Sequence, residues 1–106
     1  MNIAFSPALR DALTKWLDHL VALDGASAHT IKAYRADTTA FLTFLGQHLG
    51  GSTGIGQITG VTQSDMRAFM AHERGRGTGA RSLARTLSAV KGFARWLAER
   101  EGFEPT

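Results

Sequence analysis

Apolar residues recur every three or four positions along most of the chain, which is the period of a helix buried on one face. The first stripe consists of Leu9, Leu13, Trp16, Leu20 and Leu23. Ser6 supplies a capping hydroxyl, Pro7 suits the first helical turn, and Gly25 is a stop signal. The pattern predicts a helix over residues 7–24.

A second helix is predicted over residues 28–49, beginning after Ser27. Its apolar stripe consists of Ile31, Tyr34, Thr38, Phe41, Leu42, Leu45 and Leu49. The opposite, polar side consists of Lys32, Ala33, Ala36, Asp37, Ala40 and Thr43. Phe44 lies outside the stripe, so we expect it to contact a flanking helix. Gly50 and Gly51 are expected to end the helix.

A third helix is predicted over residues 63–74, with a buried stripe of Met66, Phe69 and Met70. Thr62 and Asp65 have the spacing of a capping box, and Val61 and Met66 that of a hydrophobic staple. Gly75 and Gly77 are expected to end this helix.

Residues 50–60, between the second and third helices, contain five glycines and are expected to form a flexible connector. Gly54-Ile55-Gly56 superficially resembles a phosphate-binding loop. It follows a helix rather than a strand, and no Gly-Lys-Ser/Thr triplet is present, so we do not assign it that role.

A fourth helix is predicted over residues 80–100, with Gly79 as a weak N-cap. On a helical wheel, one arc carries Arg81, Arg85, Lys91 and Arg95. The opposed arc carries Leu83, Leu87, Val90, Ala94 and Leu97. Gly92 falls in the basic arc, where a missing side chain would admit another backbone closely. The four stripes predict an all-α, four-helix bundle.

Composition narrows the function classes. The chain has 106 residues, of which 43% are hydrophobic, and no cysteine, so we expect one globular domain without disulfides or zinc–thiolate sites. No apolar run has the length of a membrane span and no signal peptide is evident, so we expect a cytoplasmic protein.

Charge is distributed unevenly. Residues 1–60 hold four cations and four acids, whereas residues 61–100 hold eight cations and three acids, a net +5. Seven of those eight cations are Arg, whose guanidinium suits phosphate. A basic half of this kind indicates a nucleic-acid partner, with an ordinary solvated face as the alternative.

Catalytic chemistry has little support in the sequence. The histidines, His19, His29, His48 and His72, lack metal-ligand spacing, so we expect no metal site and no cofactor. Tyr34 lies at the edge of an apolar stripe, which indicates a core residue rather than a nucleophile.

Two segments resemble a known family. Ser27, Thr30, Tyr34 and Asp37 are spaced as in the S-x-x-T-x-x-x-Y-x-x-D opening of the second helix of Xer-type tyrosine recombinases. Residues 80–97, ARSLARTLSAVKGFARWL, are similar to that family's fourth helix, most of all in its XerC branch. Residues 61–67 resemble the start of its third helix.

The resemblance implies an orthogonal, SAM-like core-binding domain over residues 1–106, whose second and fourth helices face duplex DNA. By position, DNA contact would fall on His29, Thr30, Lys32, Ala33, Arg81, Ser82, Arg85, Lys91 and Arg95. The family's catalytic residues belong to a following domain, so we expect a non-catalytic fragment of a recombinase. Implied partners of the parent are sister recombinase subunits in a tetramer and a DNA translocase.

Three alternatives remain open at this point. The chain could be a helical protein–protein interaction module, since SAM-like bundles also serve in that role. It could be a small enzyme, which would need a polar cleft. Within the recombinase assignment, the parent could act in chromosome dimer resolution or in integration of a mobile element.

Overall fold

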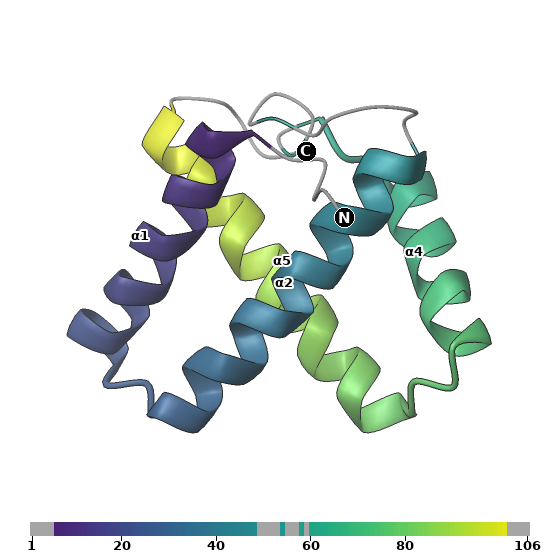
Figure 1. Cartoon of the computed structure of the whole chain (residues 1–106), viewed down its shortest axis with the longest axis horizontal. Coiled ribbons are helices and arrows are strands. Elements are labelled where there is room, and N and C mark those ends of the chain that lie inside the picture. The colour runs from purple at the N-terminus through teal and green to yellow at the C-terminus, as the bar shows by residue number, and fades with distance from the viewer. Residues whose placement is uncertain (1–5, 49–53, 55–57, 59, 102–106) are drawn as a thin grey trace.

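The computed structural model describes residues 6–48, 54, 58 and 60–101. Its helices are α1 (Pro7–Asp24), α2 (Ala28–His48), α4 (Gln63–Gly75) and α5 (Ala80–Glu101). The two longest, α2 and α5, cross at the centre, with α1 and α4 at the flanks (Figure 1). No strand occurs in the described part of the chain. The predicted orthogonal all-α bundle is confirmed, and each helix end lies within one residue of its prediction.

The predicted signals at the ends of α1 and α2 are present. The Ser6 hydroxyl accepts a hydrogen bond from the Leu9 N–H at 3.1 Å, and Gly25 ends α1 with a left-handed φ of 64°. The Ser27 hydroxyl accepts from the Thr30 N–H at 3.1 Å at the start of α2. These caps satisfy backbone groups that the helix itself leaves unpaired. Gly50 and Gly51 lie outside the described residues.

A reciprocal capping box begins α4, as the sequence predicts. The Asp65 N–H donates to the Thr62 hydroxyl at 3.1 Å, and the Thr62 N–H donates to the Asp65 carboxylate at 3.0 Å. The hydrogen bond from the Thr62 backbone is the main cause that holds the pKa of Asp65 below its ordinary value of 3.8. Val61 and Met66, the expected staple, are both half-buried against the core.

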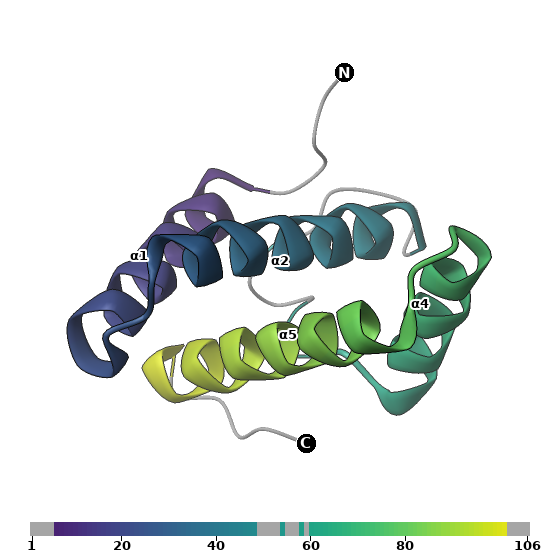
Figure 2. The ribbon, with the colours of Figure 1, turned by 90° about the horizontal axis from the view of Figure 1, so that it is seen from below.

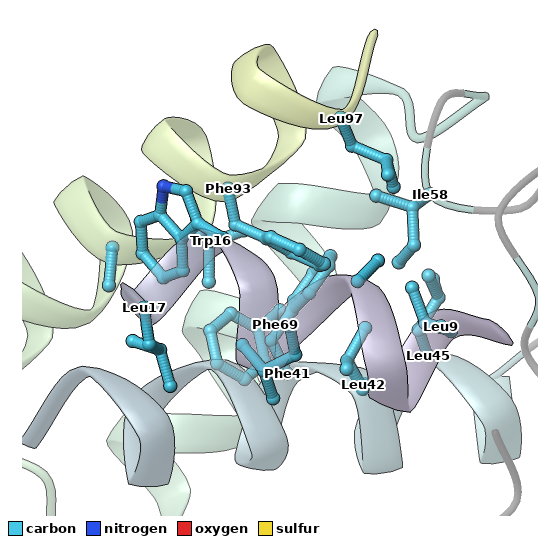
Figure 3. Packing of buried hydrophobic residues seen from close by; sticks show 14 residues of the cluster. Leu9, Trp16, Leu17, Phe41, Leu42, Leu45, Ile58, Phe69, Phe93 and Leu97 are labelled. Carbon is cyan, nitrogen blue, oxygen red and sulfur yellow. The ribbon is translucent and has the colours of Figure 1, made fainter. Parts of the chain in front are cut away.

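Aromatic residues join the helices in the core (Figure 3). Trp16 of α1 stacks on Tyr34 of α2 with ring centroids 6.0 Å apart, and meets Phe93 of α5 at 5.4 Å. Phe41 of α2 contacts Phe69 of α4 edge to face at 5.1 Å. Tyr34 is thus part of the packing, as predicted. Together these rings connect α1, α2, α4 and α5.

Phe44 contacts the flanking helix α4, as its position outside the stripe predicts. Its ring centroid lies 5.5 Å from that of Phe69 and 5.1 Å from that of His72. These contacts give α2 and α4 a second aromatic connection beside that of Phe41.

Ile58 corrects the prediction for the glycine-rich connector. Its side chain is 2% exposed and belongs to the same core cluster as Leu45 and Leu97 (Figure 3). The prediction of a flexible connector is therefore wrong at Ile58, because burial of this side chain holds the residue in the core. Most of the connector, including Ile55 and Gly56 of the glycine triplet, lies outside the described residues.

The buried face of α5 is turned, relative to the prediction, toward the side of the helix that carries Arg85 and Gly92. Leu83, Val90 and Leu97 are buried as expected, but Leu87 and Ala94 are only half-buried. Thr86, Ala89, Phe93 and Ala98 are buried as well, which shifts the centre of the face by about 40° on the wheel. The cause is that α5 packs on both α1 and α2, so its contact face is broader than one leucine stripe.

We expect Leu97→Ala to destabilise the fold by about 2–5 kcal/mol, since Leu97 is fully buried and truncation leaves a cavity. Leu87→Ala removes the same atoms from a half-buried site and should cost clearly less. Denaturant unfolding of both variants measures the difference. Equal losses would contradict the burial assigned to the two leucines.

We expect Asp65→Ala to cost about 1 kcal/mol at neutral pH through loss of the capping box. Because folding lowers the pKa of Asp65, its contribution is complete above about 3.8 and is lost as the pH falls through the lowered value. Thermal melts of wild type and variant should therefore converge on acidification. A gap that stays constant or widens in acid would contradict this sign.

Candidate nucleic-acid interface

The predicted DNA-contact residues lie on two helices that begin on the same side of the molecule (Figure 1). Figure 2 views the molecule from that side and shows α2 and α5 next to each other, with α1 and α4 at the ends. His29, Thr30, Lys32 and Ala33 lie in the first two turns of α2. Arg81, Ser82, Arg85, Lys91 and Arg95 lie along α5.

The first turns of α2 present cations without exposed acids. His29, Lys32 and Arg35 are exposed, and Asp37, the helix's one acid, is buried. Ala33 and Thr30 are half-buried, and the Thr30 hydroxyl accepts from the Ser27 hydroxyl at 3.1 Å. Thr30 therefore takes part in the cap. Arg35 was missed by the sequence reading, although its spacing of three from Lys32 places it on the same side of the helix.

An exposed stripe runs along α5 with alternating spacings of three and four residues, and we call it the α5 stripe. It consists of Arg81, Ala84, Ser88, Lys91 and Arg95, all exposed. The three cations extend over about 21 Å of helix. Ala84 and Ser88 were not among the predicted contacts, but their small side chains leave room between the cations for a close neighbour.

Gly92 does not provide such room. A methyl group added at its Cα would lie 3.3 Å from the Trp16 ring, tighter than an ordinary contact. Its missing side chain admits Trp16 of α1 and not an external backbone, so the expectation for Gly92 is wrong. The reason is the broader buried face of α5, which extends to this part of the basic arc.

Arg85 is bound within the protein. Its Nε and Nη2 donate to the two carboxylate oxygens of Asp37, each at 2.7 Å. The Thr86 hydroxyl lies 3.0 Å from the same carboxylate, and Asp37 is 6% exposed. Asp37 is thus buried although it lies on the polar side of the second helix in the sequence pattern, because a partner 48 positions away in the sequence compensates its burial. This carboxylate raises the pKa of Arg85 above its ordinary value.

A second buried acid fixes the turn that leads into α5. The Glu73 carboxylate accepts from Arg76 at 2.7 Å and from the Thr78 hydroxyl at 3.1 Å, and its carbonyl accepts from the Thr78 N–H at 3.0 Å. Gly77 takes a left-handed φ of 87° within this turn. The cluster holds the segment immediately before Arg81, and the sequence reading missed it.

No group of three His, Asp or Glu side chains in the described residues could hold a metal ion. In the same part of the chain, no helix is long and apolar enough to cross a membrane.

Comparison with known proteins places this arrangement in a family. Residues 13–101 match the family described as phage integrase, N-terminal SAM-like domain. The chain is 40% identical over 98 residues to tyrosine recombinase XerC of Mesorhizobium japonicum, covering 92% of this chain and 31% of that protein. It is 35% identical over 102 residues to tyrosine recombinase XerC of Rhodospirillum centenum, covering 96% and 30%. No solved structure shows a significant match.

The chain therefore belongs to the phage integrase N-terminal SAM-like domain family. Its relatives are tyrosine recombinases, and it spans less than a third of their length. The resemblance drawn from the second and fourth helices is confirmed.

We expect Arg85→Ala to destabilise the fold by about 1–3 kcal/mol, because it leaves the buried Asp37 carboxylate without its main partner. Arg81→Ala, one turn away and exposed, should change stability by no more than about 0.5 kcal/mol. Thermal melts of both variants test this contrast. An Arg85→Ala protein as stable as Arg81→Ala would show that the ion pair contributes nothing to the fold.

Proposed function

We propose that this chain is the DNA-binding domain of a site-specific tyrosine recombinase and that α2 and α5 bind duplex DNA. The observation that carries the proposal is the joint exposure of acid-free, cationic faces on two helices. Both helices begin on the same side of the bundle (Figure 1). Between Ala80 and Ala98, α5 contains no acidic residue.

The physical fit to DNA has three parts. Cations along about 21 Å of α5 match the repeating charge of a duplex backbone. The amino termini of α2 and α5 carry partial positive charge and free N–H groups, which favour nearby phosphates. Small side chains between the cations allow a helix to approach the wall of a major groove about 12 Å wide.

The proposal extends to a full-length tyrosine recombinase of the kind that the relatives represent. There the domain would hold DNA while residues of another domain cut and rejoin it through a phosphotyrosyl intermediate. Tyr34 is not the nucleophile in this scheme, since it is half-buried and stacked on Trp16. We further propose assembly with sister recombinase subunits and cooperation with a DNA translocase in chromosome dimer resolution.

Two alternatives have an observation in their favour. Val21 and Leu23 near the end of α1 are 50% and 70% exposed, which favours a protein-interaction module. The family match to phage integrases favours integration of a mobile element. The first alternative predicts binding to a protein with weak dependence on salt, whereas the DNA proposal predicts the opposite.

We expect the chain to bind mixed-sequence duplex DNA with a log–log salt slope of about −4, as four to five phosphate contacts give. Arg81→Ala should flatten this slope by about 1 unit, since it removes one contact. Lys15→Ala on α1 is the matched control, because it removes an exposed cation away from the proposed surface. Fluorescence titrations at several salt concentrations provide the slopes.

Binding that does not respond to salt would overturn the DNA proposal. A slope that falls equally in Arg81→Ala and Lys15→Ala would show that net charge, and not the α5 stripe, accounts for the attraction.

A further inference from the structure

The ion pair of Asp37 and Arg85 joins α2 and α5, the two helices that cross at the centre of the fold (Figure 1). Both carboxylate oxygens of Asp37 are engaged by Arg85, and one of them also lies 3.0 Å from the Thr86 hydroxyl. A bidentate contact fixes the relative orientation of the two side chains as well as the distance between them. It therefore constrains how α5 is placed against α2.

The pair lies close in sequence to the cations that we assign to DNA. On α2, Asp37 follows Lys32 and Arg35, and on α5, Arg85 follows Arg81 by one turn and precedes Lys91. A small change of the crossing at this point displaces the exposed faces of both helices relative to each other. Phosphate contacts made by two helices at once depend on that relative placement.

The carboxylate also competes with DNA for Arg85. The guanidinium already uses Nε and Nη2 on Asp37, which is one of the two edges that could make a bidentate contact with a phosphate. Moving it to DNA would leave a carboxylate that is 6% exposed without its main partner, which is costly. Although Arg85 is partly exposed, it is therefore less available for contact with DNA than Arg81.

We infer that Arg85 is a positioning residue of the DNA-binding surface: through Asp37 it sets the relative placement of the α2 face and the α5 stripe, and it does not serve as a phosphate contact. This inference rests on the proposed function.

The two possible roles of Arg85 predict opposite effects for Asp37→Asn. If Arg85 contacts phosphate, removing the competing charge frees it and tightens binding. If Arg85 positions the helices, weakening the pair loosens the surface and binding weakens, although the variant gains positive charge. Asp11→Asn on α1 is the matched control, since it makes the same charge change at a site that is 63% exposed and paired with Lys15, one turn further along the same helix.

The experiment is a titration of mixed-sequence duplex DNA with wild type, Asp37→Asn, Asp11→Asn and Arg85→Gln at several salt concentrations. We expect Asp37→Asn to bind about 2- to 30-fold more weakly than Asp11→Asn. Arg85→Gln should lose affinity with an unchanged salt slope, in contrast to Arg81→Ala. A double variant that carries both Asp37→Asn and Arg85→Gln should bind DNA no more weakly than the weaker of the two single variants, because both changes act through one contact.

Asp37→Asn binding as tightly as Asp11→Asn, or more tightly, would overturn the inference, as would a slope in Arg85→Gln flattened by about 1 unit. Circular dichroism at the assay temperature establishes that each variant is folded. Should Asp37→Asn not fold, the slope of Arg85→Gln decides the question. Failure of the proposed function has a different signature, namely wild-type protein that shows no salt-dependent binding at all.

Discussion

The arrangement of the proposed interface depends on one constraint, a buried carboxylate in the middle of α2. Asp37 can be buried only because Arg85 and Thr86 of α5 supply donors to it. The same contact engages one cation within the protein and places two helices against each other. The division between cations that hold the fold and cations that face outward follows from this pair.

Small residues on α5 serve two different neighbours. Gly92 gives space to Trp16, which in turn stacks on Tyr34 of α2 and contacts Phe93 of α5. Ala84 and Ser88 instead lie between exposed cations. One side of α5 thus packs against the aromatic core, and the other carries exposed cations separated by small side chains. A helix packed in this way presents a narrow exposed stripe, and in our account that stripe is the surface for DNA.

The helices are predictable from the sequence because local chemistry determines them. Contacts between residues far apart in the sequence are not predictable in this way. Ser6, Gly25, Ser27, Thr62 and Asp65 act within a few positions of themselves, and all behave as their residue types predict. The pairing of Asp37 with Arg85 depends on the crossing of two helices, which no periodicity encodes. The predicted buried face of α5 differs from the observed one for a related reason. It was placed from the leucines and omitted Thr86, Ala89 and Phe93, which are buried against other helices. At Ile58, high glycine content obscured one buried apolar side chain.

The central claim is that the exposed faces of α2 and α5, and not Arg85 itself, meet DNA. Nuclear magnetic resonance of the labelled chain during titration with duplex DNA tests it most directly. The account predicts shifts gathered at the start of α2 and along the α5 stripe, while the Nε–H resonance of Arg85 keeps the signature of its bond to Asp37. Shifts gathered on α1 and α4, or an Arg85 resonance that moves in step with Arg81, would contradict the account.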